Sequence, residues 1–224
     1  MNTPSGPKDL TPPLKLGTSA SVQDAKNYFL TQWGPNEFND PPRGSDVPYG
    51  YKDCGPTSAV MALSALGIMT RPSAADASIA IDHMRDQIYG YDSTQSHGLG
   101  LGPANYPGTV AYGLVAAGAD VAMIKNNRTD LDAAIDRGNP VIIGTSNTYD
   151  AWGRDQLLAG NYLNGGNPGG HFVTVLGRTA NGNYIVGDPL VKGGPIEVTA
   201  AQMDKALAGA FSTDSLAEVS LHKK

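Results

Sequence analysis

The sequence of 224 residues has little cysteine, little charge of either sign and no long apolar run. A single cysteine excludes an internal disulfide and provides no second thiolate for a zinc site built on cysteines. A formal net charge of −5 without a basic cluster argues against nucleic acid as the main partner. No apolar stretch reaches the roughly 18 residues of a membrane-spanning helix. We therefore expect no metal, no other cofactor and no membrane insertion.

Glycine and proline are abundant, with 28 and 16 residues, which indicates many loops. The length suits one domain with its own apolar core. Residues 1–17 are rich in proline, serine, threonine and lysine and lack the apolar segment of a Sec signal peptide. We expect a flexible arm over residues 1–20 and a single domain over residues 21–224. Without a Sec signal, the protein is expected in the cytoplasm or exported by a signal-independent secretion system.

The only cysteine, Cys54, stands at the predicted start of a buried helix. Pro56 suits the first helical turn, where no backbone N–H is needed, and Gly67 predicts the end of the helix. Unpaired N–H groups and the positive end of the helix dipole favour a thiolate over a thiol at such a position. A thiolate is the nucleophile that cysteine chemistry needs. The alternative is that Cys54 is only a small buried apolar residue.

A predicted β-hairpin supplies partners for this cysteine. His171 begins one predicted strand, residues 171–177, and Asp188 follows the other, residues 183–187. Antiparallel strands joined by a short turn place these two side chains at the same end of the hairpin. There the imidazole could take the thiol proton, and the carboxylate could fix its tautomer.

His97 is the alternative base, in a glycine-rich segment over residues 91–102. It lacks a following strand and a paired carboxylate, which favours His171. Trp152 lies in a long predicted loop, residues 146–168, where it could form a substrate subsite or cover the hairpin. We favour the covering role, because large aromatic side chains usually serve packing.

The rest of the chain alternates between helical and extended patterns. Helices are expected over residues 21–33, 74–89, 107–117, 129–137 and 199–208. Further strands are expected over residues 119–124, 139–145, 194–198 and 211–222. This pattern predicts an α+β fold.

The motifs DCGPTS, GGHFVTVLG and NYIVGDP, in this order, resemble the C39-like peptidases of the papain-like cysteine peptidase superfamily over about residues 27–190. The resemblance implies a helical part, with Cys54 on its central helix, packed on a mostly antiparallel sheet that carries His171 and Asp188. It implies Cys54 as nucleophile, His171 as general base and Asp188 as the residue that orients the histidine. Gln32 resembles a glutamine that the family carries upstream of the cysteine. The resemblance implies that its side chain would form an oxyanion hole together with the Cys54 backbone N–H.

The resemblance also implies a cysteine hydrolase that cleaves an amide bond in a peptide, a protein or a peptidoglycan peptide. A signal-free chain without accessory domains fits an exported bacterial effector or toxin, with a cognate inhibitor or immunity protein as partner. The alternatives are a catalytically inert binding module, a peptidoglycan amidase and an acyltransferase that uses the same triad.

Overall fold

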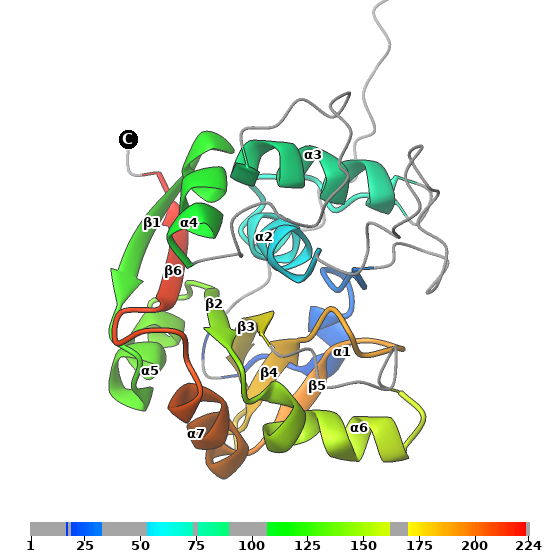
Figure 1. Ribbon diagram of the computed structural model, residues 1–224, viewed down its shortest axis with the longest axis vertical. Helices are drawn as coiled ribbons and strands as arrows, with labels where there is room; N and C mark the ends of the chain where they lie inside the picture. Colours follow the sequence, from blue (N-terminus) through cyan, green and yellow to red (C-terminus); the bar gives the residue numbers. More distant parts are fainter. Residues whose placement is uncertain are drawn as a thin grey trace, which may run out of the picture.

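The computed structural model describes residues 17, 19–32, 53–73, 76–89, 107–161 and 170–222. Its centre is a six-stranded sheet with the order β1-β6-β2-β3-β4-β5, in which every neighbouring pair is antiparallel (Figure 1). The strands are β1 (Ala119–Ile124), β2 (Val141–Thr145), β3 (His171–Arg178), β4 (Tyr184–Gly187), β5 (Ile196–Val198) and β6 (Leu216–Leu221).

The helices cover both faces of this sheet. They are α1 (Val22–Ala25), α2 (Cys54–Ala65), α3 (Ala77–Tyr89), α4 (Pro107–Ala116), α5 (Arg128–Asp136), a π-helix (Tyr149–Gly153), α6 (Arg154–Leu158) and α7 (Ala200–Ala208). One core forms between α2, α3, α4 and one face of the sheet, and a second forms between the other face, α5, α7 and the π-helix. The predicted α+β fold is confirmed.

Helix α2 lies at the centre of the first core, with α3 on one side and the sheet on the other (Figure 1). Every one of its twelve residues is buried. An α-helix that is apolar all round is typical of such a position. The hydroxyl of Thr174 on β3 donates a hydrogen bond of 2.9 Å to the carbonyl of Ser58 on α2. This bond fixes the Cys-bearing helix against the strand that carries His171.

The predicted helix over residues 21–33 is wrong beyond its first turn. Of residues 21–32, which the structure describes, only Val22–Ala25 is helical, and a turn follows. Tyr28, Phe29 and Leu30 are consecutive and all buried, which one face of a helix cannot achieve. The chain instead reaches the segment that follows β4, where the backbone N–H of Gln32 donates to the carbonyl of Pro189 at 3.1 Å.

The predicted loop over residues 146–168 also differs, because the π-helix and α6 occupy its first part. These helices are short, and α6 buries none of its residues. The hydrophobic periodicity that would have identified them is therefore missing. Within the described residues, no helix combines the length and the apolar character needed to cross a bilayer.

Candidate active site

Cys54 is the first residue of α2, as the sequence predicts, and it is a free cysteine with 7% of its surface exposed. Asp53 is the N-cap residue, but its carboxylate makes no capping hydrogen bond to the helix. The first backbone N–H groups of a helix have no partner within the helix, so the Cys54 N–H is available by position. The sulfur thus lies where backbone donors and the helix dipole favour negative charge.

His171 and Asp188 meet at one end of the β3–β4 hairpin. His171 is the first residue of β3, and Asp188 directly follows β4. The Nε2 atom of His171 lies 2.7 Å from Oδ1 of Asp188, and both side chains are buried. The hairpin arrangement predicted from the sequence is therefore present in the structure.

The second ring nitrogen of His171 completes the arrangement. Because Nε2 is committed to Asp188, Nδ1 is the nitrogen that can face the Cys54 sulfur. Burial lowers the pKa of His171, but the charge and hydrogen bond of Asp188, together with the hydrogen bond and charge of Cys54, raise the pKa to about 10. Asp188 and Cys54 therefore both act on the imidazole of His171.

Asp188 has further partners that sequence reasoning did not find. Its Oδ1 also accepts a hydrogen bond of 2.9 Å from the backbone N–H of Leu190, and its Oδ2 accepts one of 2.8 Å from the indole Nε1–H of Trp152. The expectation that Trp152 only covers the hairpin is incomplete. Its buried indole needs a hydrogen-bond acceptor, as buried tryptophans generally do, but nothing in the sequence points to Asp188.

Gln32 is buried beside this end of the sheet. Its backbone N–H binds the carbonyl of Pro189, the residue after Asp188, and its side chain is 3% exposed. The structure thus brings Gln32 to the His171–Asp188 end of the hairpin. The oxyanion role suggested for its side chain stays a prediction.

The alternative base and the polar residues at the end of β2 complete the survey of candidate site residues. His97 lies outside the described residues. Thr145 Oγ1 donates to the carbonyl of Ala206 at 2.6 Å, and Asn147 Nδ2 donates to that of Lys205 at 3.2 Å, so both side chains hold the end of α7. Among the residues that the structure describes, no group of His, Cys, Asp and Glu side chains is arranged to hold a metal ion.

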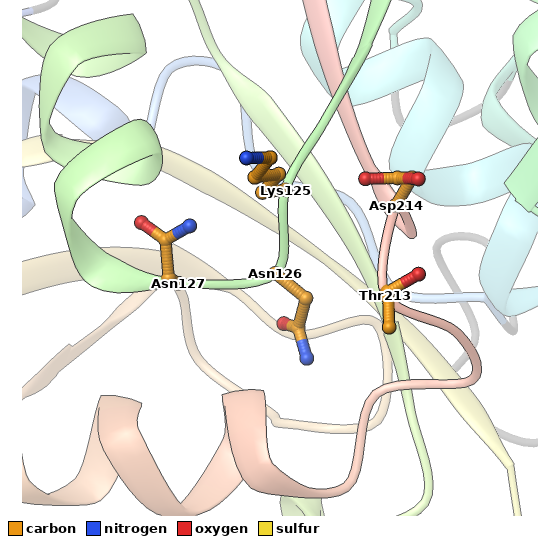
Figure 2. A pocket seen from close by; sticks show the side chains of 5 residues that line it. All are labelled: Lys125, Asn126, Asn127, Thr213 and Asp214. Atoms are coloured by element: carbon orange, nitrogen blue, oxygen red, sulfur yellow. The ribbon is translucent and has the colours of Figure 1, made fainter.

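A separate surface pocket of about 430 Å³ lies between the start of α5 and the loop before β6 (Figure 2). Its lining residues are Lys125, Asn126, Asn127, Thr213 and Asp214. Asn126 is occupied in structural hydrogen bonds, through Nδ2 to the carbonyl of Leu207 and through its backbone N–H to that of Thr213. No triad residue lines this pocket, so it is separate from the candidate active site.

A central helix that begins at a cysteine, packed on an antiparallel sheet that carries a His–Asp pair, defines the papain-like class of fold. Residues 30–209 match the model of the Peptidase_C39 like family, and the chain belongs to this family. The resemblance predicted from the three motifs is confirmed.

One solved structure supports the fold assignment. A crystal structure of a "putative C39-like peptidase" from Bacillus anthracis superposes on the chain with a TM-score of 0.50. The alignment has 17% sequence identity and covers 77% of this chain and 90% of the other. No curated protein matches the chain in sequence. The family indicates a function of the cysteine peptidase type.

Proposed function

We propose that the protein is a cysteine hydrolase that cleaves an amide bond through Cys54, His171 and Asp188. One observation carries the proposal: a buried imidazole binds a carboxylate through Nε2, and the only cysteine of the chain is among the groups that raise the pKa of this imidazole. This is the arrangement of nucleophile, base and orienting group that acyl transfer requires.

In the proposed reaction, the Cys54 sulfur attacks the carbonyl carbon of the substrate, and His171 holds the thiol proton. The Cys54 backbone N–H and the Gln32 side chain stabilise the oxyanion. His171 then protonates the leaving amine as the C–N bond breaks, which leaves a thioester on Cys54. Water, deprotonated by His171, hydrolyses this thioester and regenerates the thiol. Asp188 keeps the imidazole in place throughout.

The proposed substrates are peptides, proteins or the peptide part of peptidoglycan. All three present an amide carbonyl, and the triad acts on it in the same way. We extend the proposal to a role as a bacterial effector or toxin, countered by an inhibitor or immunity protein. In that case the protein is exported, and disruption of the secretion system that carries it should change its location.

The first experiment is the rate of Cys54 alkylation by iodoacetamide across pH, in the wild type and in His171→Ala. Because the chain has one cysteine, all labelling reports Cys54, and Cys54→Ser provides the blank. We expect fast labelling that persists well below pH 7 in the wild type and is slowed by His171→Ala. Labelling that rises only near pH 8.5 and is indifferent to His171→Ala would contradict the proposed mechanism.

Cleavage is tested by a screen of peptides, unfolded proteins and peptidoglycan fragments. Cys54→Ala should abolish any cleavage with little change in folding, and Asp188→Ala should reduce cleavage by a smaller factor. His171→Ala should also abolish cleavage, but it lowers stability because the buried Asp188 carboxylate loses the imidazole, so its fold is checked by circular dichroism. Activity retained in Cys54→Ala would exclude the mechanism. An acyltransferase is distinguished by adding an amine acceptor and measuring whether the acyl group passes to the amine or to water.

The burial of Cys54 favours a second candidate, a binding module with an inert cysteine. With only 7% of Cys54 exposed, a substrate carbonyl needs a local opening to reach the sulfur. The alkylation experiment separates the two candidates, because an inert module has no reason to keep a reactive thiolate.

A further inference from the structure

Trp152 connects the π-helix to the triad. Its side chain is 1% exposed, and its indole N–H donates the 2.8 Å hydrogen bond to Asp188 Oδ2. Trp152 is 36 residues from Asp188 in the chain, so only the tertiary fold brings the two together.

The local backbone explains how the indole reaches the carboxylate. The backbone N–H of Arg154 donates to the carbonyl of Tyr149, five residues earlier, which is the hydrogen bond of a π-helix. This turn holds one more residue than an α-helical turn and is often found at functional sites. Ala151, Trp152 and Gly153 are all buried in it, whereas the following α6 is not. The widened turn thus inserts the indole into the second core.

The hydrogen bonds of Asp188 divide between its two oxygens. Oδ1 accepts from His171 and from the backbone N–H of Leu190, and Oδ2 accepts from Trp152. A carboxylate can rotate about its last side-chain bond, and the preference there is broad. An indole is a donor only, and a packed ring has little freedom to move. The hydrogen bond from Trp152 therefore keeps the Asp188 carboxylate in the orientation in which Oδ1 faces His171.

We propose that Trp152 is a positioning residue of the triad: its indole N–H locks the Asp188 carboxylate, and Asp188 in turn fixes His171 beside Cys54. The inference rests on the proposed function. Loss of the indole N–H leaves a buried carboxylate oxygen without that donor, which favours rotation of the Asp188 carboxylate. This rotation weakens the hydrogen bond between Asp188 and His171.

Trp152→Phe tests the proposal because it keeps a buried aromatic ring and removes the donor. We expect Cys54 alkylation at about pH 6 to slow by about tenfold or more, with a shifted pH profile. Tyr184→Phe is the matched control. Tyr184 is also 1% exposed, and its hydroxyl donates to a different carboxylate, Asp132 Oδ1, at 2.6 Å. Tyr184→Phe should lower stability and leave the alkylation profile unchanged.

A role in packing alone would lower the melting temperature of Trp152→Phe without changing its alkylation profile, and that result overturns the proposal. If Trp152→Phe does not fold, the indole N–H signals of the wild type provide the test by NMR. The chain has two tryptophans, and the Trp152 signal should titrate with the same apparent pKa as the alkylation rate. A signal that does not follow the alkylation rate also overturns the proposal.

The outcomes separate this inference from the proposed function. If wild type and His171→Ala alkylate alike, as an ordinary thiol does, the proposed function fails whatever Trp152→Phe shows. If His171→Ala slows alkylation and Trp152→Phe behaves as the wild type, only the role of Trp152 fails.

Discussion

Arg85 on α3 binds the carboxylate of Asp53, the residue immediately before Cys54, with two N–H groups. Its Nε donates to Oδ1 at 2.6 Å and its Nη2 donates to Oδ2, and its Nη1 forms an ion pair of 3.0 Å with Asp82. Asp53 is completely buried. The start of the Cys-bearing helix is thus joined to α3 by a bidentate ion pair, the geometry for which the arginine fork is suited.

Replacement of Arg85 should destabilise the fold strongly. In Arg85→Met the buried Asp53 carboxylate loses its main cationic partner, and a broken buried ion pair costs about 3–5 kcal/mol. Urea unfolding measures this loss. The control is Arg128→Met, whose 3.4 Å ion pair with Asp204 is exposed and should contribute about 0–1 kcal/mol. Equal effects of the two replacements would show that the Asp53–Arg85 pair has no special role.

Replacement by alanine should have different effects on stability at two glycines of α4. A Cβ at Gly113 would collide with Ile88 Cγ1 on α3 and lie 3.2 Å from the Cα of Ile88, whereas a Cβ at Gly108 meets nothing within 4 Å. We expect Gly113→Ala to lower the free energy of unfolding by about 1–3 kcal/mol, because the added methyl group overpacks the contact with α3. Gly108→Ala should be neutral or gain up to about 1 kcal/mol, because alanine favours a helix. Thermal unfolding of the two variants checks this, and a tolerated Gly113→Ala would disprove the close contact of α3 with α4.

The pKa of His171 predicts a pH dependence of stability. The folded protein raises this pKa from the ordinary 6.5 to about 10, so it retains a proton that the unfolded chain releases above about pH 6.5. The stabilisation is complete below pH 6.5 and is lost as the pH rises through about 10. The slope for one proton is at most about 1.4 kcal/mol per pH unit.

Urea unfolding from about pH 7 to 9.5 measures this effect. The Cys54→Ser variant removes the titration of the thiol, and Cys54→Ser/His171→Gln provides the comparison. The free energy of unfolding should fall more steeply with pH in the chain that keeps His171. Parallel pH profiles would mean that Asp188 does not hold a proton on this imidazole.

The sequence predicts those features that depend on local pattern. The helix start at Cys54 follows from Pro56 and from the run of helix formers after it, and β1 has the predicted bounds. The meeting of His171 and Asp188 could be predicted because a hairpin brings together residues that are only 17 positions apart.

Contacts between distant segments were not predicted, because no local pattern encodes them. Asp53 and Arg85 are 32 positions apart and come from two different helices. Trp152 reaches Asp188 only because the π-helix, which has no strong sequence signal, turns the indole toward the sheet. Which charged or polar side chains meet inside a core depends on how the helices and strands pack together. Helix and strand propensities carry little information about this packing.

Glu218 on β6 should contribute to stability against acid. Burial raises its pKa, but hydrogen bonds from Arg137 and Asn139 and the charge of Arg137 lower it more, so the pKa lies below the ordinary 4.5. Its stabilisation is present above pH 4.5 and is lost as the pH falls through the lower folded pKa. The difference in unfolding free energy between wild type and Glu218→Gln should shrink between about pH 6 and 3. Asp204→Asn, which breaks an exposed ion pair with Arg128, is the control variant.

If the Gln32 side chain stabilises an oxyanion, its loss should affect two reactions of the Cys54 sulfur differently. Alkylation by iodoacetamide displaces iodide at a saturated carbon and forms no oxyanion. Acylation by p-nitrophenyl acetate passes through a tetrahedral intermediate with a negative oxygen. Loss of one oxyanion donor costs about 10²–10³-fold in such a step. Gln32→Ala should therefore slow the release of p-nitrophenolate by about this factor and leave the alkylation rate nearly unchanged.

Gln202→Ala is the control for Gln32→Ala, because Gln202 belongs to the capping box of α7 and should affect stability alone. If Gln32→Ala slows both reactions equally, Gln32 acts by placing Cys54 or His171 rather than by binding the oxyanion. If it slows neither, the oxyanion is stabilised by the Cys54 backbone N–H with some other donor. Only a selective loss of acylation supports the assignment, because the two reactions share the nucleophile and differ in whether negative charge develops on oxygen.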